Sequence, residues 1–232
     1  MIAAPVDHIR GGLVVSCQAP PGHPLHDSHV LALLARCAEI GGAKGVRVNG
    51  PDDVRAAKQL VDVPIIGLYK LRRADSRDLI TPGFDYAAQL ARAGADVIAV
   101  EATAETVGDP VELIRRVRAE LGLPVMADVS TTDEGMRAWD AGAELVGTTL
   151  AGYTPYSDSG TGPDIELVRN LSRKGVRTVA EGRYATVRDV AAALDAGAWS
   201  VVIGSAITDA LTITRNLVQA MAIQATTDRD TP

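Results

Sequence analysis

The sequence predicts a single (β/α)8 TIM barrel that occupies residues 1–232. Short apolar runs rich in Val and Ile alternate eight times with longer amphipathic segments, which indicates parallel strands that are each followed by a helix. Hydrophobic residues make up 47% of the chain but aromatic residues only 3%, so the core must consist mainly of aliphatic side chains, as in sheets buried on both faces. No Gly-x-Gly-x-x-Gly motif follows the first run, which argues against an open dinucleotide-binding sheet.

The eight apolar runs are the predicted strands, because their length and their Val and Ile content favour strands over buried helices. They are Gly12–Gln18, Lys44–Asn49, Pro64–Lys70, Asp96–Glu101, Pro124–Ser130, Glu144–Thr149, Arg177–Gly182 and Ser200–Ser205. The connectors also repeat, since Gly-Gly-Ala or Ala-Gly-Ala precedes alternate strands. The repeat unit is therefore two strand–helix pairs long.

The segments between the strands carry the signals that begin and end helices. Ser28 is placed to cap a helix that ends at Gly41. Capping-box spacing, in which a hydroxyl and a carboxylate satisfy free amides at a helix start, occurs at Thr131–Glu134 and at Thr186–Asp189. These signals place helices after the first, fifth and seventh strands.

The last helical pattern, residues 210–225, contains enough apolar side chains to cover the barrel and, in a homodimer, a second subunit. A polar tail follows it from about residue 226, and we expect this tail to be mobile. The remaining chain shows no linker or low-complexity stretch, which is consistent with one domain.

Charge and cysteine content argue against several classes of protein. A net charge of −6 argues against nucleic acid or an anionic membrane as the partner. The two cysteines, Cys17 and Cys37, have no paired spacing, so neither a disulfide framework nor a zinc site is expected, and Cys17 is interpreted as a small buried hydrophobe. Asp7 and His8 stand where a signal peptide would need an apolar core. No apolar run approaches the roughly 20 residues of a membrane span. We therefore expect a cytoplasmic location.

Polar residues follow the predicted strands at their carboxyl ends, which form the active face of a TIM barrel. They are Gln18, Arg47, Asn49, Lys70, Glu101, Asp128, Thr148, Thr149, Glu181, Gly204 and Ser205. Any strand can become polar as it leaves the core, but a convergent set indicates a site at one mouth.

Lys70 stands out, because a lysine ends an otherwise apolar strand. It either extends its ammonium past the rim to water or acts as a base whose pKa is lowered by partial burial. Glu181 ends a strand four positions away in the barrel, so it should lie across the mouth from Lys70. Two groups that exchange protons on either side of a carbon would form an acid/base pair.

The last two strand ends favour a phosphate site. Gly182 with Arg183, and Gly204 with Ser205, place exposed backbone amides and a guanidinium where TIM barrels commonly bind phosphate. The glycines could alternatively serve only to permit tight turns.

Three histidines, His23, His26 and His29, lie in the first loop with a spacing of three. Without a carboxylate–histidine motif on a helix face, a solvated loop is the preferred interpretation over a metal site. No metal is therefore expected.

Nine segments of the chain match motifs of one known family, in order and without large gaps. They read GLVVSCQAPPGHPLH, GGAKGVRVNGPDDV, VPIIGLYK, DSRDLITP, MADVSTTDEG, LVGTTLAGYTPYS, GPDIELV, VAEGR and VVIGSAIT. From Gly12 to about Thr208 the chain resembles the N-acetylmannosamine-6-phosphate 2-epimerases of bacterial sialic acid catabolism.

The resemblance implies that N-acetylmannosamine 6-phosphate and N-acetylglucosamine 6-phosphate are interconverted by removal and return of the proton at C2, with no cofactor. It implies that Lys70 is the acid/base at C2 and that Glu181 is the second proton-handling group. It also implies sugar contacts from Gln18, Arg47, Asp128, Thr149 and Tyr153, and phosphate contacts from Gly182, Arg183, Gly204 and Ser205. A homodimer is consistent with the family.

The chain departs from the family pattern at two places. After the fourth strand the family usually has Leu-Asp-Ala-Thr and then basic residues, but here Glu101 replaces the aspartate, and Ala104 and Glu105 follow. Asp209 and Ala210 stand where the family usually has Arg-Pro. Asp209 would repel a dianion if it pointed at the phosphate, so the departures concern the phosphate or the sugar rather than the proton transfer.

Three other functions remain open at this point. The substrate could be a related or unphosphorylated 2-acetamido sugar, for which the same proton transfer would serve. Lys70 could instead attack a carbonyl in a Schiff-base lyase. A non-catalytic sugar-phosphate-binding barrel is the third, although the presence of both Lys70 and Glu181 argues against it.

Overall fold

Eight parallel strands close into a barrel in the order β1-β10-β9-β8-β7-β6-β3-β2, which confirms the predicted fold class. The computed structural model describes residues 4–73, 77–157 and 160–227, with side chains up to residue 221. The barrel strands are β1 (Leu13–Cys17), β2 (Gly45–Asn49), β3 (Ile65–Leu68), β6 (Val97–Glu101), β7 (Val125–Asp128), β8 (Leu145–Gly147), β9 (Thr178–Ala180) and β10 (Ser200–Ile203). Each is shorter than the run that predicted it, because the ladder ends where the chain turns into a loop.

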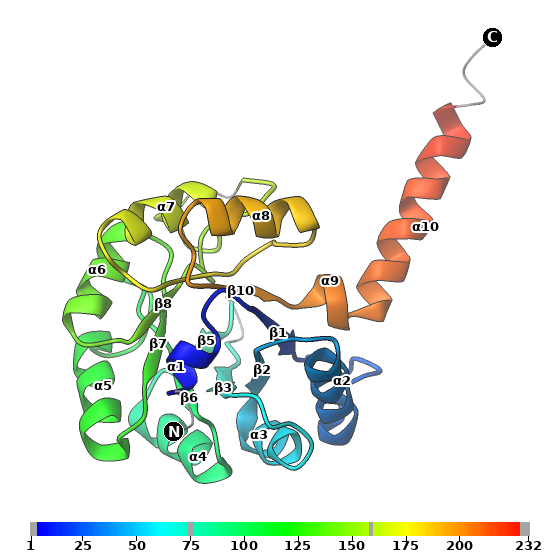
Figure 1. The fold of residues 1–232 in the computed structure, drawn as a ribbon. Helices are drawn as coiled ribbons and strands as arrows, with labels where there is room; N and C mark the ends of the chain where they lie inside the picture. The colour runs from blue at the N-terminus through cyan, green and yellow to red at the C-terminus, as the bar shows by residue number, and fades with distance from the viewer. Residues whose placement is uncertain (1–3, 74–76, 158–159, 228–232) are drawn as a thin grey trace.

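Helices form a ring around the barrel (Figure 1). They are α2 (Ser28–Ile40), α3 (Gly50–Lys58), α4 (Phe84–Ala93), α5 (Pro110–Arg116) with a π-helical extension η1 (Val117–Leu121), α6 (Thr132–Asp140), α7 (Ile165–Arg173) and α8 (Val187–Asp195). A short helix α1 (Pro5–His8) lies across the amino-terminal end of the barrel. The ring is interrupted between α8 and α2, where the four-residue helix α9 (Ser205–Thr208) leads into α10 (Ala210–Thr227).

The helix-start signals are largely confirmed. Both capping boxes, at Thr131–Glu134 and Thr186–Asp189, are formed. The prediction for Ser28 is wrong, because Asp27 is the N-cap and its carboxylate accepts a hydrogen bond from the Val30 N–H. The Ser28 hydroxyl instead donates to Asp53 of α3, so Ser28 links α2 to α3.

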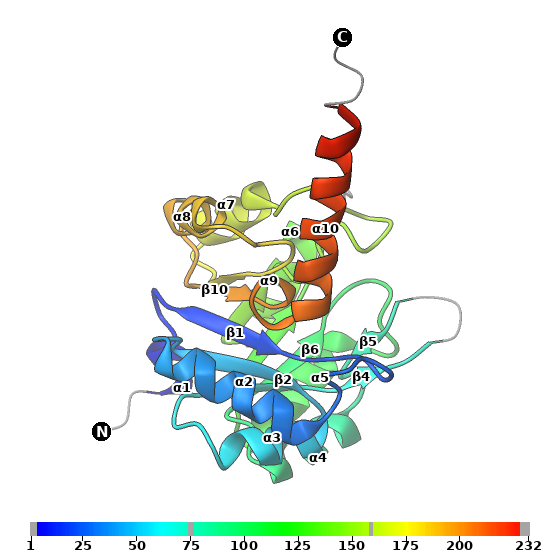
Figure 2. The same cartoon turned by 90° about the vertical axis from the view of Figure 1, so that its right-hand side faces the viewer.

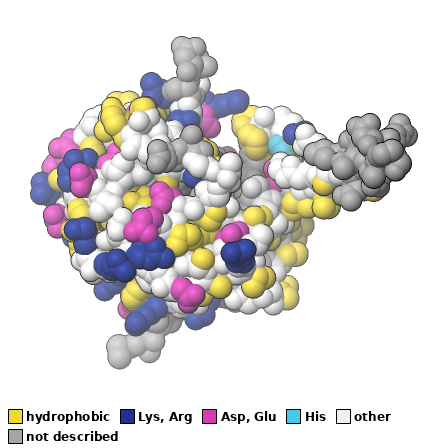
Figure 3. Space-filling view, turned by 90° about the horizontal axis from the view of Figure 1, so that it is seen from above, with side chains coloured by type: hydrophobic (Ala, Val, Ile, Leu, Met, Phe, Trp, Pro, Cys, Tyr) yellow, Lys and Arg dark blue, Asp and Glu magenta, His cyan; other side chains and the backbone are white. Residues whose placement is uncertain are grey.

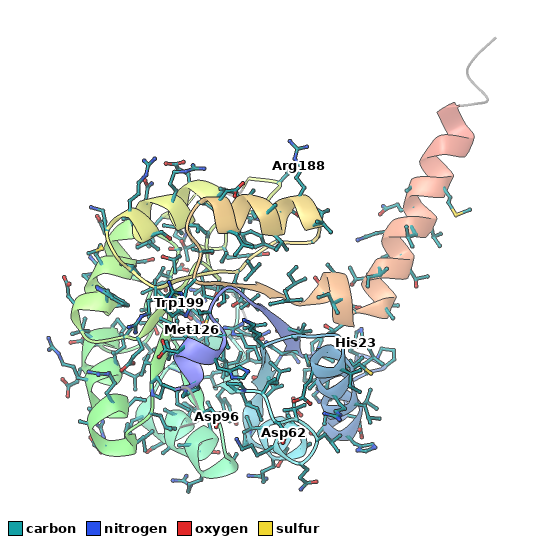
Figure 4. The ribbon with its side chains drawn as sticks, viewed as in Figure 1. His23, Asp62, Asp96, Met126, Arg188 and Trp199 are labelled. Carbon is teal, nitrogen blue, oxygen red and sulfur yellow. The ribbon has the colours of Figure 1, made fainter. Side chains whose placement is uncertain are left out.

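Inward-facing side chains fill the barrel, while the alternate residues pack beneath the helices. The inner layer consists of Val14, Ile66, Leu68, Val97, Ala99, Met126, Leu145, Val179 and Val202, with Val6 and Ile9 closing the amino-terminal end. Met126 and Trp199 are labelled near the middle of the ring in Figure 4. The same alternation places Arg47 on the inner side of β2, between the outward-facing Val46 and Val48.

Lys70 is not the last residue of a barrel strand, which corrects the predicted range Pro64–Lys70. Strand β3 ends at Leu68, and Lys70 begins β4 (Lys70–Leu71), which pairs antiparallel with β5 (Leu79–Ile80). The chain leaves the parallel ladder because the Tyr69 N–H donates to Thr81 and the Lys70 N–H donates to the Asn49 side chain. Figure 2 shows this hairpin beyond the carboxyl ends of β1 and β2.

The last helix, α10, does not cover its own barrel, which corrects the expectation that residues 210–225 would do so. It projects from the molecule in both ribbon views (Figures 1 and 2) and in the space-filling view (Figure 3). None of its residues from 210 to 221 is buried. Among the described helices, none has the combination of length and apolar character that a membrane crossing requires.

Candidate active site

A cavity of about 480 Å³ opens at the carboxyl-terminal mouth of the barrel. Its wall includes every residue predicted for the site except Asp128, namely Gln18, Arg47, Lys70, Thr149, Tyr153, Glu181, Gly182, Arg183, Gly204 and Ser205. Arg47 lies in β2 and Lys70 in β4, and the other residues lie in the segments that follow β1, β8, β9 and β10. Strand ends that are far apart in sequence therefore meet in one place, because all the barrel strands are parallel.

Arg47 is the centre of a buried ionic cluster at the base of this cavity. Its side chain is only 3% exposed, and its two Nη atoms lie 2.6 Å from Asp128 Oδ2 and 2.6 Å from Glu181 Oε1. The Thr149 hydroxyl lies within hydrogen-bond distance of both carboxylates. Within the described part of the chain, Arg47 Nε is a buried donor without a hydrogen-bond partner.

Asp128 lies behind the cavity wall rather than on it, and its carboxylate is fully buried. Burial raises the pKa of Asp128 to about 7, and Glu181 acts in the same direction, whereas Arg47 and Thr149 oppose the rise. Gly147 makes room for the carboxylate, because a Cβ at that position would lie 2.8 Å from Asp128 Oδ1. The structure thus gives Asp128 contacts with Arg47 and Thr149.

Glu181 is held at the end of β9 by its own backbone. The Thr148 hydroxyl donates to the Glu181 carbonyl at 2.8 Å and accepts from the Glu181 N–H at 3.0 Å. The two residues that follow, Gly182 and Arg183, both have positive φ values, 100° and 63°. Such a turn is natural for glycine and uncommon for arginine, and it aims the Glu181 carboxylate inward at Arg47.

Lys70 reaches the cavity from the opposite side of the barrel, because β3 and β9 are diametrically placed in the strand order. Its side chain is exposed and lines the cavity. Desolvation lowers the pKa of Lys70, and the charge of Arg47 lowers it further, while Glu181, Asp78 and Asp128 oppose the shift. A lysine with a lowered pKa is more often neutral, and only the neutral amine can accept a proton.

The other end of the cavity is lined by backbone and by a second arginine. Gly204 packs against Ser16, where a Cβ would lie 3.3 Å from the Ser16 Cβ. Arg183 donates from Nε to the Gly162 carbonyl at 2.7 Å and stacks over Tyr153 at 5.3 Å. Gln18 donates to the Ser16 hydroxyl at 2.7 Å.

Asp209 also lines the cavity, but its carboxylate is already engaged. It accepts from the Thr212 N–H at 2.9 Å and from the Thr212 hydroxyl at 2.6 Å at the start of α10. Oδ1 lies 3.3 Å from His23 Nε2, and His23 is labelled beside α2 in Figure 4. These contacts, led by those with Thr212, lower the pKa of Asp209, so the residue is anionic and tied to α10 and the first loop.

Several residues of the cavity wall were not predicted as site residues. They are Ser16, Arg77, Asp78, Ile80, Leu150, Tyr184, Val202 and Thr208. Ser16 and Val202 have inward positions on strands that alternation could have identified. Arg77 and Asp78 lie in an irregular connection before β5, where no periodic signal marks them.

Two minor predictions have structural outcomes. Cys17 is fully buried, and burial raises its pKa to about 12, which confirms that it is a buried hydrophobe rather than a nucleophile. Among the residues that the structure describes, no group of three or more His, Cys, Asp or Glu side chains is arranged to hold a metal ion. His23 contacts Asp209, and His26 contacts the Ala19 carbonyl.

The fold and this site define a TIM-barrel enzyme with a lysine at its cavity and two carboxylates paired with one arginine. Residues 31–223 match the model of the N-acetylmannosamine-6-phosphate epimerase family. Two proteins named as N-acetylmannosamine-6-phosphate 2-epimerases are similar to this chain. The one from Caldanaerobacter subterraneus subsp. tengcongensis is 42% identical over 221 residues, which cover 92% of each chain. The one from Cutibacterium acnes is 44% identical over 212 residues, which cover 89% of this chain and 92% of the other. The chain belongs to this family, which confirms the resemblance.

Solved structures agree. The N-acetylmannosamine-6-phosphate 2-epimerase from Clostridium perfringens superimposes with a TM-score of 0.88 at 36% identity, and the match covers 93% of this chain and 95% of that chain. A thiamine phosphate pyrophosphorylase from Pyrococcus furiosus has a TM-score of 0.58 at 16% identity, covering 89% of this chain and 90% of the other. The second likeness shows only the shared barrel fold.

Proposed function

We propose that this protein interconverts N-acetylmannosamine 6-phosphate and N-acetylglucosamine 6-phosphate by moving the proton at C2. The observation that carries the proposal is the placement of Lys70 and Glu181 on opposite sides of one cavity, with Arg47 between them. Epimerisation at one carbon requires proton removal from one face and delivery to the other, so groups on both sides are needed. Membership of the family supports the choice of substrate.

In this mechanism neutral Lys70 removes the C2 proton from the open-chain sugar, where the neighbouring C1 carbonyl makes that proton acidic. The product is an enediol-type anion that is flat at C2, and Glu181, after taking up a proton, returns it to the other face. The positive charge of Arg47 at the cavity wall stabilises the developing oxyanion. Asp128 and Thr149 keep Arg47 in place throughout.

The sugar phosphate lies along the cavity, with its phosphate at the end formed by Gly182, Arg183, Gly204 and Ser205. The guanidinium of Arg183 and the amides of these turns supply the donors that a dianion needs. The Asp209 carboxylate contacts Thr212 and His23, so it does not take up the donors at this end of the cavity. Gln18 and Tyr153 contact the sugar between the two ends. Binding the phosphate away from C2 holds the reacting carbon in register with Lys70.

The test is proton NMR in D₂O with N-acetylmannosamine 6-phosphate and, in parallel, unphosphorylated N-acetylmannosamine. We expect the gluco epimer to accumulate with deuterium at C2 from the phosphorylated sugar, and to disappear in Lys70→Ala but not in Lys174→Ala, which changes an exposed lysine at the end of α7. Turnover of only the unphosphorylated sugar would move the proposal to that substrate. No exchange with either sugar would refute it.

We also propose a homodimer in which α10 of one subunit covers the barrel of another. A groove of about 390 Å³ lies outside β1 beside α2, in the gap where the ring of helices is interrupted, and it is lined by Leu13, Val15, Leu34, Ala38 and Ile207. On α10, Leu217, Val218 and Met221 are 60–72% exposed. Burying both apolar surfaces against each other would remove them from water.

Light scattering after gel filtration tests the homodimer. We expect the mass of two chains for the wild type and a shift toward one chain for Leu217→Asp, since a buried charge at the contact would be unpaired. The exposed control Arg188→Asp on α8 should not change the mass. A wild-type mass of one chain would refute the dimer.

As for location, we propose the cytoplasm, because charged sugar phosphates do not cross membranes unaided.

A further inference from the structure

The carboxylate of Glu101 is a buried acceptor for four hydrogen bonds at the end of β6. Its Oε1 lies 2.5 Å from Arg77 Nη2 and 2.6 Å from the Thr103 hydroxyl. Its Oε2 lies 2.9 Å from Arg77 Nη1 and 3.1 Å from the backbone nitrogen of Ile80. The side chain is 0% exposed, and the wall of the catalytic cavity, as far as described residues form it, does not include Glu101. Glu101 therefore has no route to a ligand and no unused oxygen.

Both Arg77 and Ile80 belong to the return limb of the hairpin that carries Lys70. Strand β5 pairs with β4 so that Ile80 is directly opposite Lys70. Glu101 thus holds the strand opposite Lys70 at two points, one through a bidentate guanidinium–carboxylate pair and one through a backbone amide. Bidentate pairs of this kind constrain orientation as well as distance.

The amine of Lys70 depends on this support, because little else restrains it. Its backbone N–H donates to Asn49 at 2.7 Å. Among the hydrogen bonds and ion pairs of the described residues, none involves Lys70 Nζ, which faces the cavity. The position of the amine is therefore set by the backbone of β4, and β4 is positioned by its pairing with β5.

We propose that Glu101 and Arg77 are positioning residues that fix the β4–β5 hairpin and thereby hold the Lys70 amine at the correct distance from the reacting carbon. The inference rests on the proposed function, in which Lys70 is the base at C2. Arg77 also lines the cavity, but both of its Nη atoms are used by Glu101, Thr103 and Glu105. It consequently acts through the hairpin and not by binding substrate.

Three variants test this role in the full-length protein. Arg77→Gln and Glu101→Gln each remove the charged bidentate pair, and Arg77→Lys keeps the charge with one hydrogen bond. Arg169→Gln, which breaks an exposed pair with Glu166 on α7, is the matched control. With N-acetylmannosamine 6-phosphate we expect the two Gln variants to lower kcat about 10- to 100-fold with KM within about threefold, as a displacement of roughly 1 Å produces. Arg77→Lys should recover part of kcat.

Hydrogen–deuterium exchange of the hairpin amides provides a readout that needs no turnover. We expect faster exchange at Ile80 and its neighbours in both Gln variants and no change in the control. Unchanged kcat and unchanged exchange would overturn the proposal, and so would a rise in KM at constant kcat, because that pattern indicates a substrate contact by Arg77. If the wild type does not turn over either sugar, the proposed function fails, while the exchange measurement still decides whether Glu101 and Arg77 fix the hairpin.

Discussion

Replacing Arg47 with methionine should destabilise the protein more than any other single change in the cavity. The variant keeps much of the side-chain length but removes the charge that lies 2.6 Å from both Asp128 and Glu181. These carboxylates are 0% and 12% exposed, so water can replace the guanidinium only in part. Removing one partner of a buried ion pair typically costs about 3–5 kcal/mol, and we expect a loss in the free energy of unfolding within this range at pH 8.

The loss should depend on pH in a defined direction. In the wild type, burial already raises the pKa of Asp128 to about 7, from an ordinary value of 3.8. Without Arg47 the charge that opposes this rise is lost, so the pKa of Asp128 in the folded state rises further. A carboxylate with a raised pKa in the folded state binds its proton more tightly there, so stability falls as pH rises from the unfolded value toward the folded value. The cost of Arg47→Met should therefore be smaller at pH 5 than at pH 8.

Urea titrations at both pH values and at equal protein concentration measure the effect. Arg169→Met is the control, since it breaks an exposed pair on α7, and exposed pairs contribute only about 0–1 kcal/mol. A loss below 1 kcal/mol for Arg47→Met, or an equal loss at pH 5 and pH 8, would refute the reasoning. The first result would mean that the carboxylates find other partners, and the second that the protonation of Asp128 does not change between pH 5 and pH 8.

Three further predictions concern the chemistry and packing of the site. The rate at which deuterium exchanges into C2 of N-acetylmannosamine 6-phosphate, which requires Lys70 but not proton return by Glu181, should rise with pH as Lys70 loses its proton, with a midpoint below the ordinary value for lysine. Glu181→Gln should lower that midpoint further, because the carboxylate raises the Lys70 pKa; a higher midpoint in the variant would contradict this. Gly147→Ala should destabilise the fold by about 1–3 kcal/mol and lower kcat, because the new methyl group would press on Asp128; unchanged thermal unfolding and kinetics would show that Asp128 can move freely. Arg183→Met should raise KM for the phosphorylated sugar about 10- to 100-fold, as expected for the loss of a charge-assisted hydrogen bond of about 1.5–3 kcal/mol. An equal rise in KM for the unphosphorylated sugar would show that Arg183 does not bind phosphate.

Much of the barrel could be predicted because its signals are local. Capping boxes such as Thr131–Glu134 involve residues three apart, and both predicted boxes are formed. The strands could be located from apolar runs, since a strand buried on both faces requires continuous hydrophobicity. The predicted strand boundaries were too long, because the end of a ladder depends on where the neighbouring strand ends.

The site was predictable where it follows from the strand order. The carboxyl ends of parallel strands must meet, so Arg47 and Glu181 could be placed at one mouth without coordinates. The contacts of Lys70 could not be predicted in this way. It lies in a hairpin whose pairing with Ile80 depends on Glu101, and no periodicity in the sequence links those residues.

The sequence by itself determined the fold class and the family, and it predicted which residues line the mouth of the barrel, because these depend on patterns that are repeated or contiguous along the chain. The tertiary structure decided which charges touch. Asp128 was expected to contact the sugar, but its carboxylate lies behind the cavity wall. Asp209, which would repel a dianion if it pointed at one, lines the cavity with its carboxylate bonded to Thr212 at the start of α10. The same holds for α10, which was expected on the barrel and instead projects from it. Such outcomes depend on competing partners at a distance of a few ångströms, and chain order does not encode which partner a charged or apolar group finds.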